Sequence, residues 1–81
     1  MGVSRLSKAV YELRQKLNLS QTELGAKLGV SAMAISRWET GRNDPPADAM
    51  AKMAKLSGDP KTFWFFLGQA GLTKRDFTGR L

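Results

Sequence analysis

The 81-residue sequence contains no cysteine and no histidine. Without cysteine there can be no disulfide framework, no zinc knuckle and no thiol nucleophile. Without histidine the chain lacks the commonest acid–base group and the commonest metal ligand. An enzyme would have few suitable groups to work with. The sequence therefore predicts a protein that is not an enzyme and that has neither a metal site nor a cofactor.

Long apolar segments are also missing. The longest apolar run is the segment 63–67, whereas a membrane-spanning helix needs about 20 apolar residues. The N-terminus has no apolar stretch of signal-peptide length, and it does not match a myristoylation signal. These absences predict a cytoplasmic protein that makes no contact with a membrane.

Acidic residues are the minority among the charged groups. Seven Asp and Glu face thirteen Lys and Arg, which leaves a formal charge of +6. The excess is spread evenly along the chain, so any basic patch must be assembled by folding. The usual partner of such a charge is a polyanion. The alternative is a basic surface that serves only solubility.

The spacing of apolar residues predicts an all-α fold, a compact bundle of about five short helices. Apolar residues recur every three or four positions within 4–17, as on one face of a helix. A fourth helix is expected to begin at Pro46 and a fifth at Asp59-Pro60. The residues expected to be buried in these two helices are Met50, Met53, Leu56, Phe63, Phe66 and Leu67. Residues 1–71 are expected to form one domain and 72–81 a C-terminal tail that could serve as an interface.

Hydroxyl side chains mark the starts of two further helices. Ser20 and Glu23 have the spacing of a capping box, in which each side chain accepts a hydrogen bond from the other's main-chain amide. This spacing predicts a helix from residue 21. Ser31 is expected to cap a helix over about 32–40.

Two glycines explain how these helices can lie close together. Gly29 is expected to take the left-handed conformation that reverses the chain between them. Gly25 is expected to face the second helix, where a side chain would hold the two axes apart. Two helices joined by so tight a turn form a helix-turn-helix, here over 21–40. The spacing of Trp38 predicts that it belongs to the core of this arrangement and does not stack on bases.

Three segments resemble a known family. The segments 19–25, 29–31 and 35–42 read LSQTELG, GVS and ISRWETGR, and they resemble the phage repressor and Cro (XRE) type of helix-turn-helix protein. The resemblance implies a lambda-repressor-like DNA-binding domain. It also implies a sequence-specific transcriptional regulator, a repressor, which binds a double-stranded DNA operator as a homodimer with its recognition helix in the major groove.

In that family the residues near the start of the recognition helix face base edges. Carried over to this sequence, the base-contacting residues are Ala32, Met33, Ser36 and Arg37. Arg37 can donate two hydrogen bonds to a guanine, or it can clamp a phosphate. Met33 can touch a thymine methyl group, or it can be a surface side chain without a directional contact. Ala32 can do the same, or it can be a helix-favouring spacer.

The resemblance also suggests contacts to the DNA backbone and one structural ion pair. The residues expected at phosphates are Gln21, Thr40, Arg42 and Asn43. Gln21 lies at the amino end of its helix, where the helix dipole favours an anion; the alternative is a solvated polar residue. Arg14 and Glu39 are expected to form a partly buried ion pair that holds the recognition helix. The alternative is two unrelated surface charges.

Four consecutive aromatic residues occupy 63–66. One helix cannot bury four neighbours on a single side, so Trp64 or Phe65 is expected to be partly exposed and to form a protein interface. Covering by the tail 72–81 is the alternative. A second candidate function follows from this segment: an antitoxin that binds a partner protein through residues 63–81.

Overall fold

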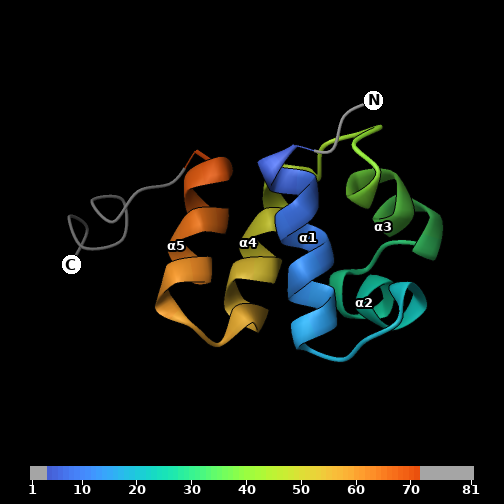
Figure 1. Cartoon of the computed structure of the whole chain (residues 1–81), viewed down its shortest axis with the longest axis horizontal. Coiled ribbons are helices and arrows are strands. Elements are labelled where there is room, and N and C mark those ends of the chain that lie inside the picture. The colour runs from blue at the N-terminus through green and yellow to red at the C-terminus, as the bar shows by residue number, and fades with distance from the viewer. Residues whose placement is uncertain (1–3, 72–81) are drawn as a thin grey trace. The chain divides into compact units, whose positions relative to one another are not determined.

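The computed structural model describes residues 4–71, and every regular element among them is an α-helix, which confirms the predicted all-α class. The helices are α1 (Arg5–Lys16), α2 (Gln21–Leu28), α3 (Ala32–Glu39), α4 (Ala47–Ser57) and α5 (Pro60–Gln69). They divide into two compact units (Figure 1). The first unit, Met1–Pro45, holds α1, α2 and α3; the second unit, Pro46–Leu81, holds α4 and α5.

Each helix of the first unit is preceded by a serine as its N-cap. At the start of α1, the Ser7 amide donates to Ser4 Oγ over 3.1 Å and the Ser4 amide donates to Ser7 Oγ over 2.8 Å. Serine at the third helical position thus completes a capping box that the sequence analysis did not anticipate. The box predicted for α2 is present, with the Glu23 amide 3.0 Å from Ser20 Oγ and the Ser20 amide 2.8 Å from Glu23 Oε1.

The buried apolar residues of the first unit come from all three helices. They are Val10, Leu13, Leu24, Leu28, Ile35 and Trp38. Both α1 and α2 pack against α3. Trp38 is buried, as its spacing predicted. Val30 is half-buried, because it lies in the turn and not on a packed helix face.

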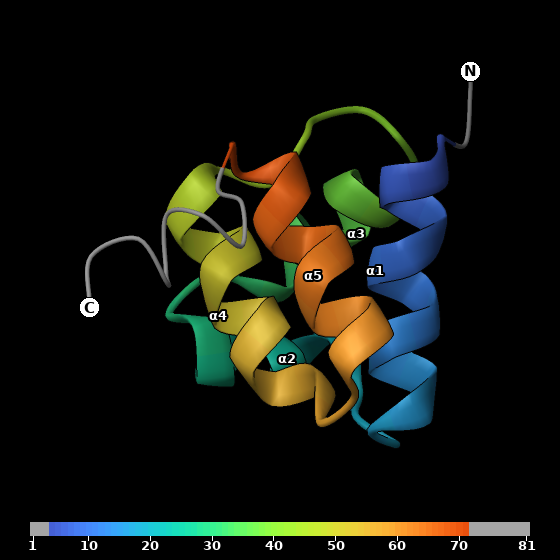
Figure 2. The same ribbon diagram turned by 90° about the vertical axis from the view of Figure 1, so that its left-hand side faces the viewer.

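The second unit is an antiparallel hairpin of two helices. Figures 1 and 2 show α4 and α5 side by side, joined by a short turn. Gly58 takes a left-handed conformation (φ 72°) at the end of α4. Asp59 Oδ1 then accepts from the amides of Lys61 and Thr62 and so caps α5.

Three details of the second unit differ from the predictions. Pro46 precedes α4 with an extended ψ of 162°, so it is the N-cap and not the first helical residue. Leu56 and Phe63 are half-buried, because a two-helix hairpin covers only part of each helix's circumference. The buried apolar residues of this unit are Ala49, Met50, Met53, Ala54, Phe66 and Leu67.

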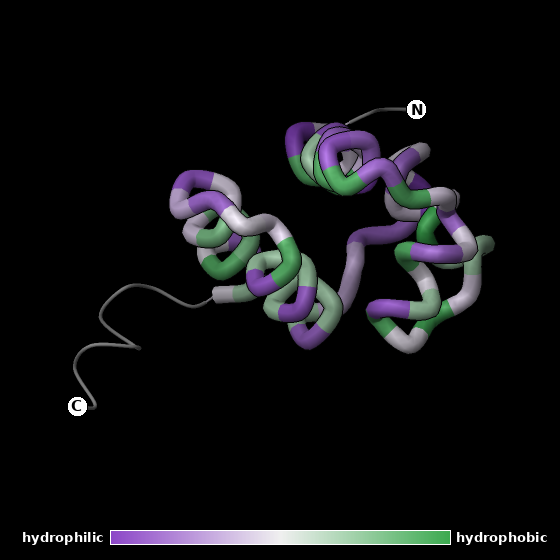
Figure 3. Tube along the Cα trace, turned by 90° about the horizontal axis from the view of Figure 1, so that it is seen from below, coloured by the Kyte–Doolittle hydropathy of each residue, from purple (hydrophilic) through white to green (hydrophobic). Residues whose placement is uncertain are grey.

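The hydropathy of the chain matches this arrangement within each unit. Within each helix hydrophilic and hydrophobic residues are interspersed along the tube, as amphipathic helices require (Figure 3). Within residues 4–71, no helix has both the length and the apolar character needed to cross a membrane. The predicted tail, 72–81, lies outside the described residues.

Candidate nucleic-acid interface

The turn between α2 and α3 depends on two glycines. Gly29 has a φ of 77°, the left-handed conformation predicted for it, and its amide bonds to the Gly25 carbonyl. The Val30 amide donates to the same carbonyl over 2.8 Å. A Cβ atom on Gly25 would lie 2.5 Å from the Val30 carbonyl oxygen and 3.2 Å from the Ser31 carbonyl carbon. Gly25 therefore permits the main chain leading into α3 to approach α2 directly.

The four predicted base-contacting residues all lie on α3, and they differ in exposure. Met33 is 61% exposed and Arg37 is exposed, whereas Ala32 and Ser36 are half-buried. Residues four apart on a helix are neighbours on one face, so Met33 and Arg37 present an apolar and a cationic group side by side. Within residues 4–71, neither side chain takes part in a hydrogen bond or an ion pair. This Met33–Arg37 face is available to an external partner.

The segment just after α3 brings the other predicted residues together. The Arg42 and Asn43 amides both donate to the Arg37 carbonyl, over 2.9 and 3.3 Å, and both side chains are exposed. Thr40 is the C-cap of α3, one residue beyond its last helical position. Its hydroxyl donates to the Ser36 and Arg37 carbonyls over 3.0 and 3.3 Å. Thr40 would have to give up these bonds before it could donate to a phosphate.

An ion pair links the first helix of the unit to the last. Arg14 Nε lies 2.6 Å from Glu39 Oε2, and Arg14 Nη2 lies 3.1 Å from Glu39 Oε1. The pairing is bidentate, which is the strongest geometry for these two groups. The side chains are only 12% and 8% exposed. The end of α3 is therefore held by a largely buried ion pair.

Two further hydrogen bonds join the same cluster, and the sequence analysis missed both. Gln21 Nε2 donates to Glu39 Oε1 over 3.1 Å. Arg14 Nη1 donates to the Leu19 carbonyl oxygen over 3.1 Å. We call Arg14, Gln21 and Glu39 the Glu39 cluster. It connects α1, the turn before α2, the first residue of α2 and the last residue of α3.

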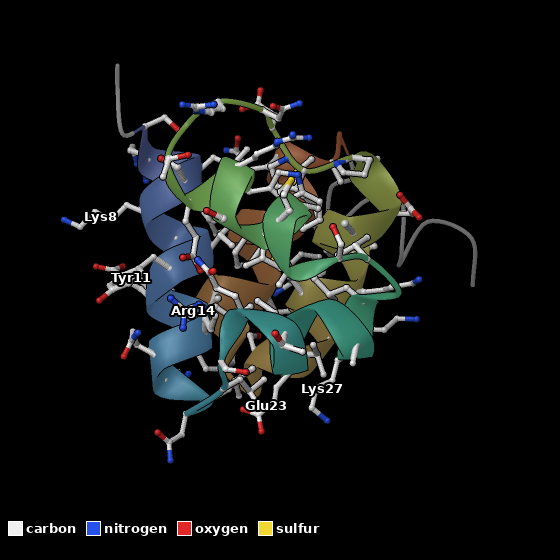
Figure 4. The ribbon with its side chains drawn as sticks, turned by 90° about the vertical axis from the view of Figure 1, so that its right-hand side faces the viewer. Lys8, Tyr11, Arg14, Glu23 and Lys27 are labelled. Carbon is white, nitrogen blue, oxygen red and sulfur yellow. The ribbon has the colours of Figure 1, made fainter. Side chains whose placement is uncertain are left out.

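The cluster keeps Arg14 firmly protonated. Its hydrogen bond with Glu39 raises the pKa of Arg14, and although burial opposes this effect, the charge of Glu39 adds to it. The Arg14 guanidinium carbon also lies 5.4 Å from the centroid of the Tyr11 ring. Figure 4 shows Arg14 directed from α1 toward α2 and α3, while Lys8 and Tyr11 project outward. The Tyr11 ring is itself 47% exposed.

The predicted protein-interface residues lie in the second unit. Trp64 and Phe65 are both half-buried. Trp64 stands edge-on to Phe63, with ring centroids 5.0 Å apart, and Phe65 packs in the same manner against Phe66 at 5.5 Å. Trp64 and Phe63 also line an open hollow of about 350 Å³ beside the α4–α5 turn. The residues predicted to meet DNA, by contrast, all belong to the first unit.

Comparison with known proteins agrees with this geometry. Residues 10–57 match the family described as Helix-turn-helix. Repressor protein C2 of Salmonella phage P22 is 31% identical over 55 residues, which are 68% of this chain and 26% of that protein. The chain thus spans only a minor part of this curated relative. No solved structure matches the chain. The family match ends at residue 57, so α5 and its aromatic residues lie beyond it.

Proposed function

Because the chain belongs to the helix-turn-helix family of the phage-repressor (XRE) type, we propose that it is a sequence-specific transcriptional regulator, a repressor. It acts by placing α3 in the major groove of double-stranded DNA. The observation that carries this proposal is the exposed Met33–Arg37 face on a helix whose two ends are both anchored. The Gly25 turn anchors its start, and the Glu39 cluster anchors its end.

The proposal divides the polar contacts into two classes. Arg37 donates two hydrogen bonds to a guanine, and Met33 and Ala32 contact thymine methyl groups. Ser36 makes a weaker polar contact to a base edge. Base contacts of this kind specify the sequence, whereas phosphate contacts set the register and add affinity.

Phosphate contacts are proposed on either side of α3. Arg42 and Asn43 follow the helix with exposed side chains. Gln21 contributes through its main chain at the start of α2, where the amides of the first turn have no carbonyl partner within the helix. Thr40 contributes only after its hydroxyl leaves the Ser36 carbonyl. Because such contacts release counterions, the affinity should fall steeply as the salt concentration rises.

The regulator is proposed to bind as a homodimer. Two copies of α3 would then read half-sites about one helical turn, or ~34 Å, apart on a roughly palindromic operator. The half-exposed aromatic residues Trp64 and Phe65 are proposed as a protein interface. This choice is supported by the low charge of α5, in which Lys61 is the single basic side chain and no side chain is acidic. Copies of a strongly basic chain can approach each other most easily through such a surface.

The experiment that tests the proposal is selection of bound duplexes from a random DNA library at near-physiological salt. A symmetric enriched motif is expected. Arg37→Ala should lose preference at one base pair per half-site, at a cost of about 1–3 kcal/mol. Lys27→Ala removes the same charge from an exposed position on α2 and should leave the motif unchanged. Binding without any enriched sequence would contradict the proposal.

A second candidate function is an antitoxin that binds a partner protein through α5. The observation that favours it is the open hollow lined in part by Phe63 and Trp64, two residues that lie beyond the end of the family match. The test is co-purification with the product of a neighbouring gene. Binding that is lost in Trp64→Ala and retained in Arg37→Ala would support this function.

A further inference from the structure

We propose that Gln21 is a positioning residue for the recognition helix. Through its hydrogen bond to Glu39 it ties the start of α2 to the end of α3, and it thereby sets the orientation in which α3 meets the bases. The inference rests on the proposed function, since its effect is defined on sequence-specific DNA binding. It assigns the Gln21 side chain a role that does not depend on touching DNA.

The first argument is the way in which Glu39 is held. Its carboxylate accepts three hydrogen bonds, two from Arg14 and one from Gln21. The bidentate bond from α1 fixes the plane of the carboxylate. The bond from Gln21 approaches from α2, the helix that leads through the turn into α3. Glu39 is therefore restrained from two helices, and the Gln21 bond joins a side chain of α2 directly to a side chain of α3.

The second argument is the burial of the contact. Glu39 is 8% exposed, so water competes weakly for its oxygens and the hydrogen bonds to it are effective restraints. Loss of the Gln21 bond would still leave Glu39 paired with Arg14. We therefore expect the fold to survive without this bond, while the end of α3 becomes less well fixed.

The third argument is the size of α3. An eight-residue helix is roughly 12 Å long, so a small tilt at its end displaces Arg37, which lies two residues before Glu39. A bidentate contact to guanine requires donor–acceptor distances of about 2.7–3.2 Å at two atoms together. Phosphate contacts from flexible side chains tolerate such a displacement. An orientation error should therefore reduce binding to the operator and leave binding to random DNA nearly unchanged.

The experiment compares Gln21→Met with wild type on two duplexes of equal length. One duplex carries the selected operator and the other a scrambled sequence, and both affinities are measured by fluorescence anisotropy at one salt concentration. Methionine has a similar length but cannot donate the hydrogen bond. We expect operator affinity to fall roughly 2–10-fold, the range for one lost hydrogen bond, with scrambled-DNA affinity unchanged. Thr22→Val is the matched control, because Thr22 is exposed at the same helix end and should keep the wild-type affinity ratio.

A second variant separates loss of the hydrogen bond to Glu39 from the other effects of replacing the glutamine side chain. Gln21→Lys retains a donor that can reach Glu39, so it should keep an operator-to-scrambled ratio near that of wild type. Urea unfolding of each variant shows that binding is measured on folded protein. If Gln21→Met weakens both duplexes equally, the Gln21 side chain is itself a phosphate contact and the inference is wrong. If both affinities stay at their wild-type values, the bond is only structural and the inference is also wrong.

The same measurements distinguish failure of this inference from failure of the proposed function. A library selection that enriches no motif contradicts both the proposed function and the inference. An enriched motif, together with an unchanged ratio of operator to scrambled-DNA affinity in Gln21→Met, contradicts only the inference.

Discussion

Replacement of Arg14 should reveal how much the Glu39 cluster contributes to stability. Arg14→Ala deletes two hydrogen bonds to Glu39 and one to the Leu19 carbonyl. Glu39, 8% exposed, then keeps only the bond from Gln21. Removing one partner of a buried ion pair costs about 3–5 kcal/mol. Because both side chains retain some exposure, 12% and 8%, we expect a loss near the lower end, about 3 kcal/mol.

The assay is urea unfolding followed by far-UV circular dichroism, with the change read from the midpoint at constant slope. Lys8→Ala is the control, because it removes a positive charge from an exposed position on the same helix. Its effect should stay within about 0.5 kcal/mol. A loss below about 1 kcal/mol for Arg14→Ala would show that solvent screens the pair, and our account of how α3 is held would be wrong.

Replacement of both partners of the ion pair tests whether the loss in Arg14 variants comes from the unpaired Glu39 carboxylate. Arg14→Met combined with Glu39→Leu removes both charges and leaves no buried carboxylate without its partner. The double variant should therefore be more stable than Arg14→Met alone.

The pair also determines how the free energy of unfolding depends on pH. Since Glu39 raises the pKa of Arg14, the stability due to Arg14 protonation is present at all pH values below its ordinary pKa. It is lost only as the pH rises through the raised value.

Three other predictions concern the turn and the proposed DNA contacts. Gly25→Ala should lower the free energy of unfolding, measured in urea, by about 1–3 kcal/mol, because its Cβ would meet a main-chain oxygen at 2.5 Å. Its control is Gly68→Ala, where no atom lies within 4 Å of the new Cβ. This control should be neutral or stabilising by up to about 1 kcal/mol. Met33→Ala should reduce the affinity change that replacement of operator thymines by deoxyuridine causes, since Ala32 keeps its own methyl contact. An undiminished response would show that Met33 makes no methyl contact. Arg42→Ala should lower affinity for all duplexes and reduce the slope of log affinity against log salt by about 1, whereas Lys27→Ala should leave that slope unchanged.

Local signals predicted the helix boundaries of the first unit well. The capping box of Ser20 and Glu23 and the left-handed Gly29 each depend on residues at most four positions apart. Such features are encoded in short sequence windows. The same reasoning failed at Pro46, because the φ angle that a proline ring fixes, −68° here, is compatible with both the N-cap and the first helical position. Only the ψ angle of 162° distinguishes the two.

Contacts distant in sequence were harder to predict. The Arg14–Glu39 pair spans 25 positions, and it was expected from family resemblance and not from spacing. Gln21 bonds to Glu39 across 18 positions, and nothing in the sequence distinguishes this glutamine from a solvated one. Its partner depends on the crossing of α2 and α3, which follows from packing. The exposure of Phe63 was missed for a similar reason, since it depends on how much of α5 its neighbour covers.

The hydrogen bond from Arg14 to residue 19 has a consequence for how the linker between α1 and α2 can vary. Its acceptor is a main-chain carbonyl, and every amino acid provides that group. The bond therefore places no demand on which side chain occupies position 19. It does demand that a carbonyl arrive at one point in space, five residues after Arg14. Among homologues, the residue type at position 19 should accordingly vary. The length of the linker should stay constant, without insertions or deletions.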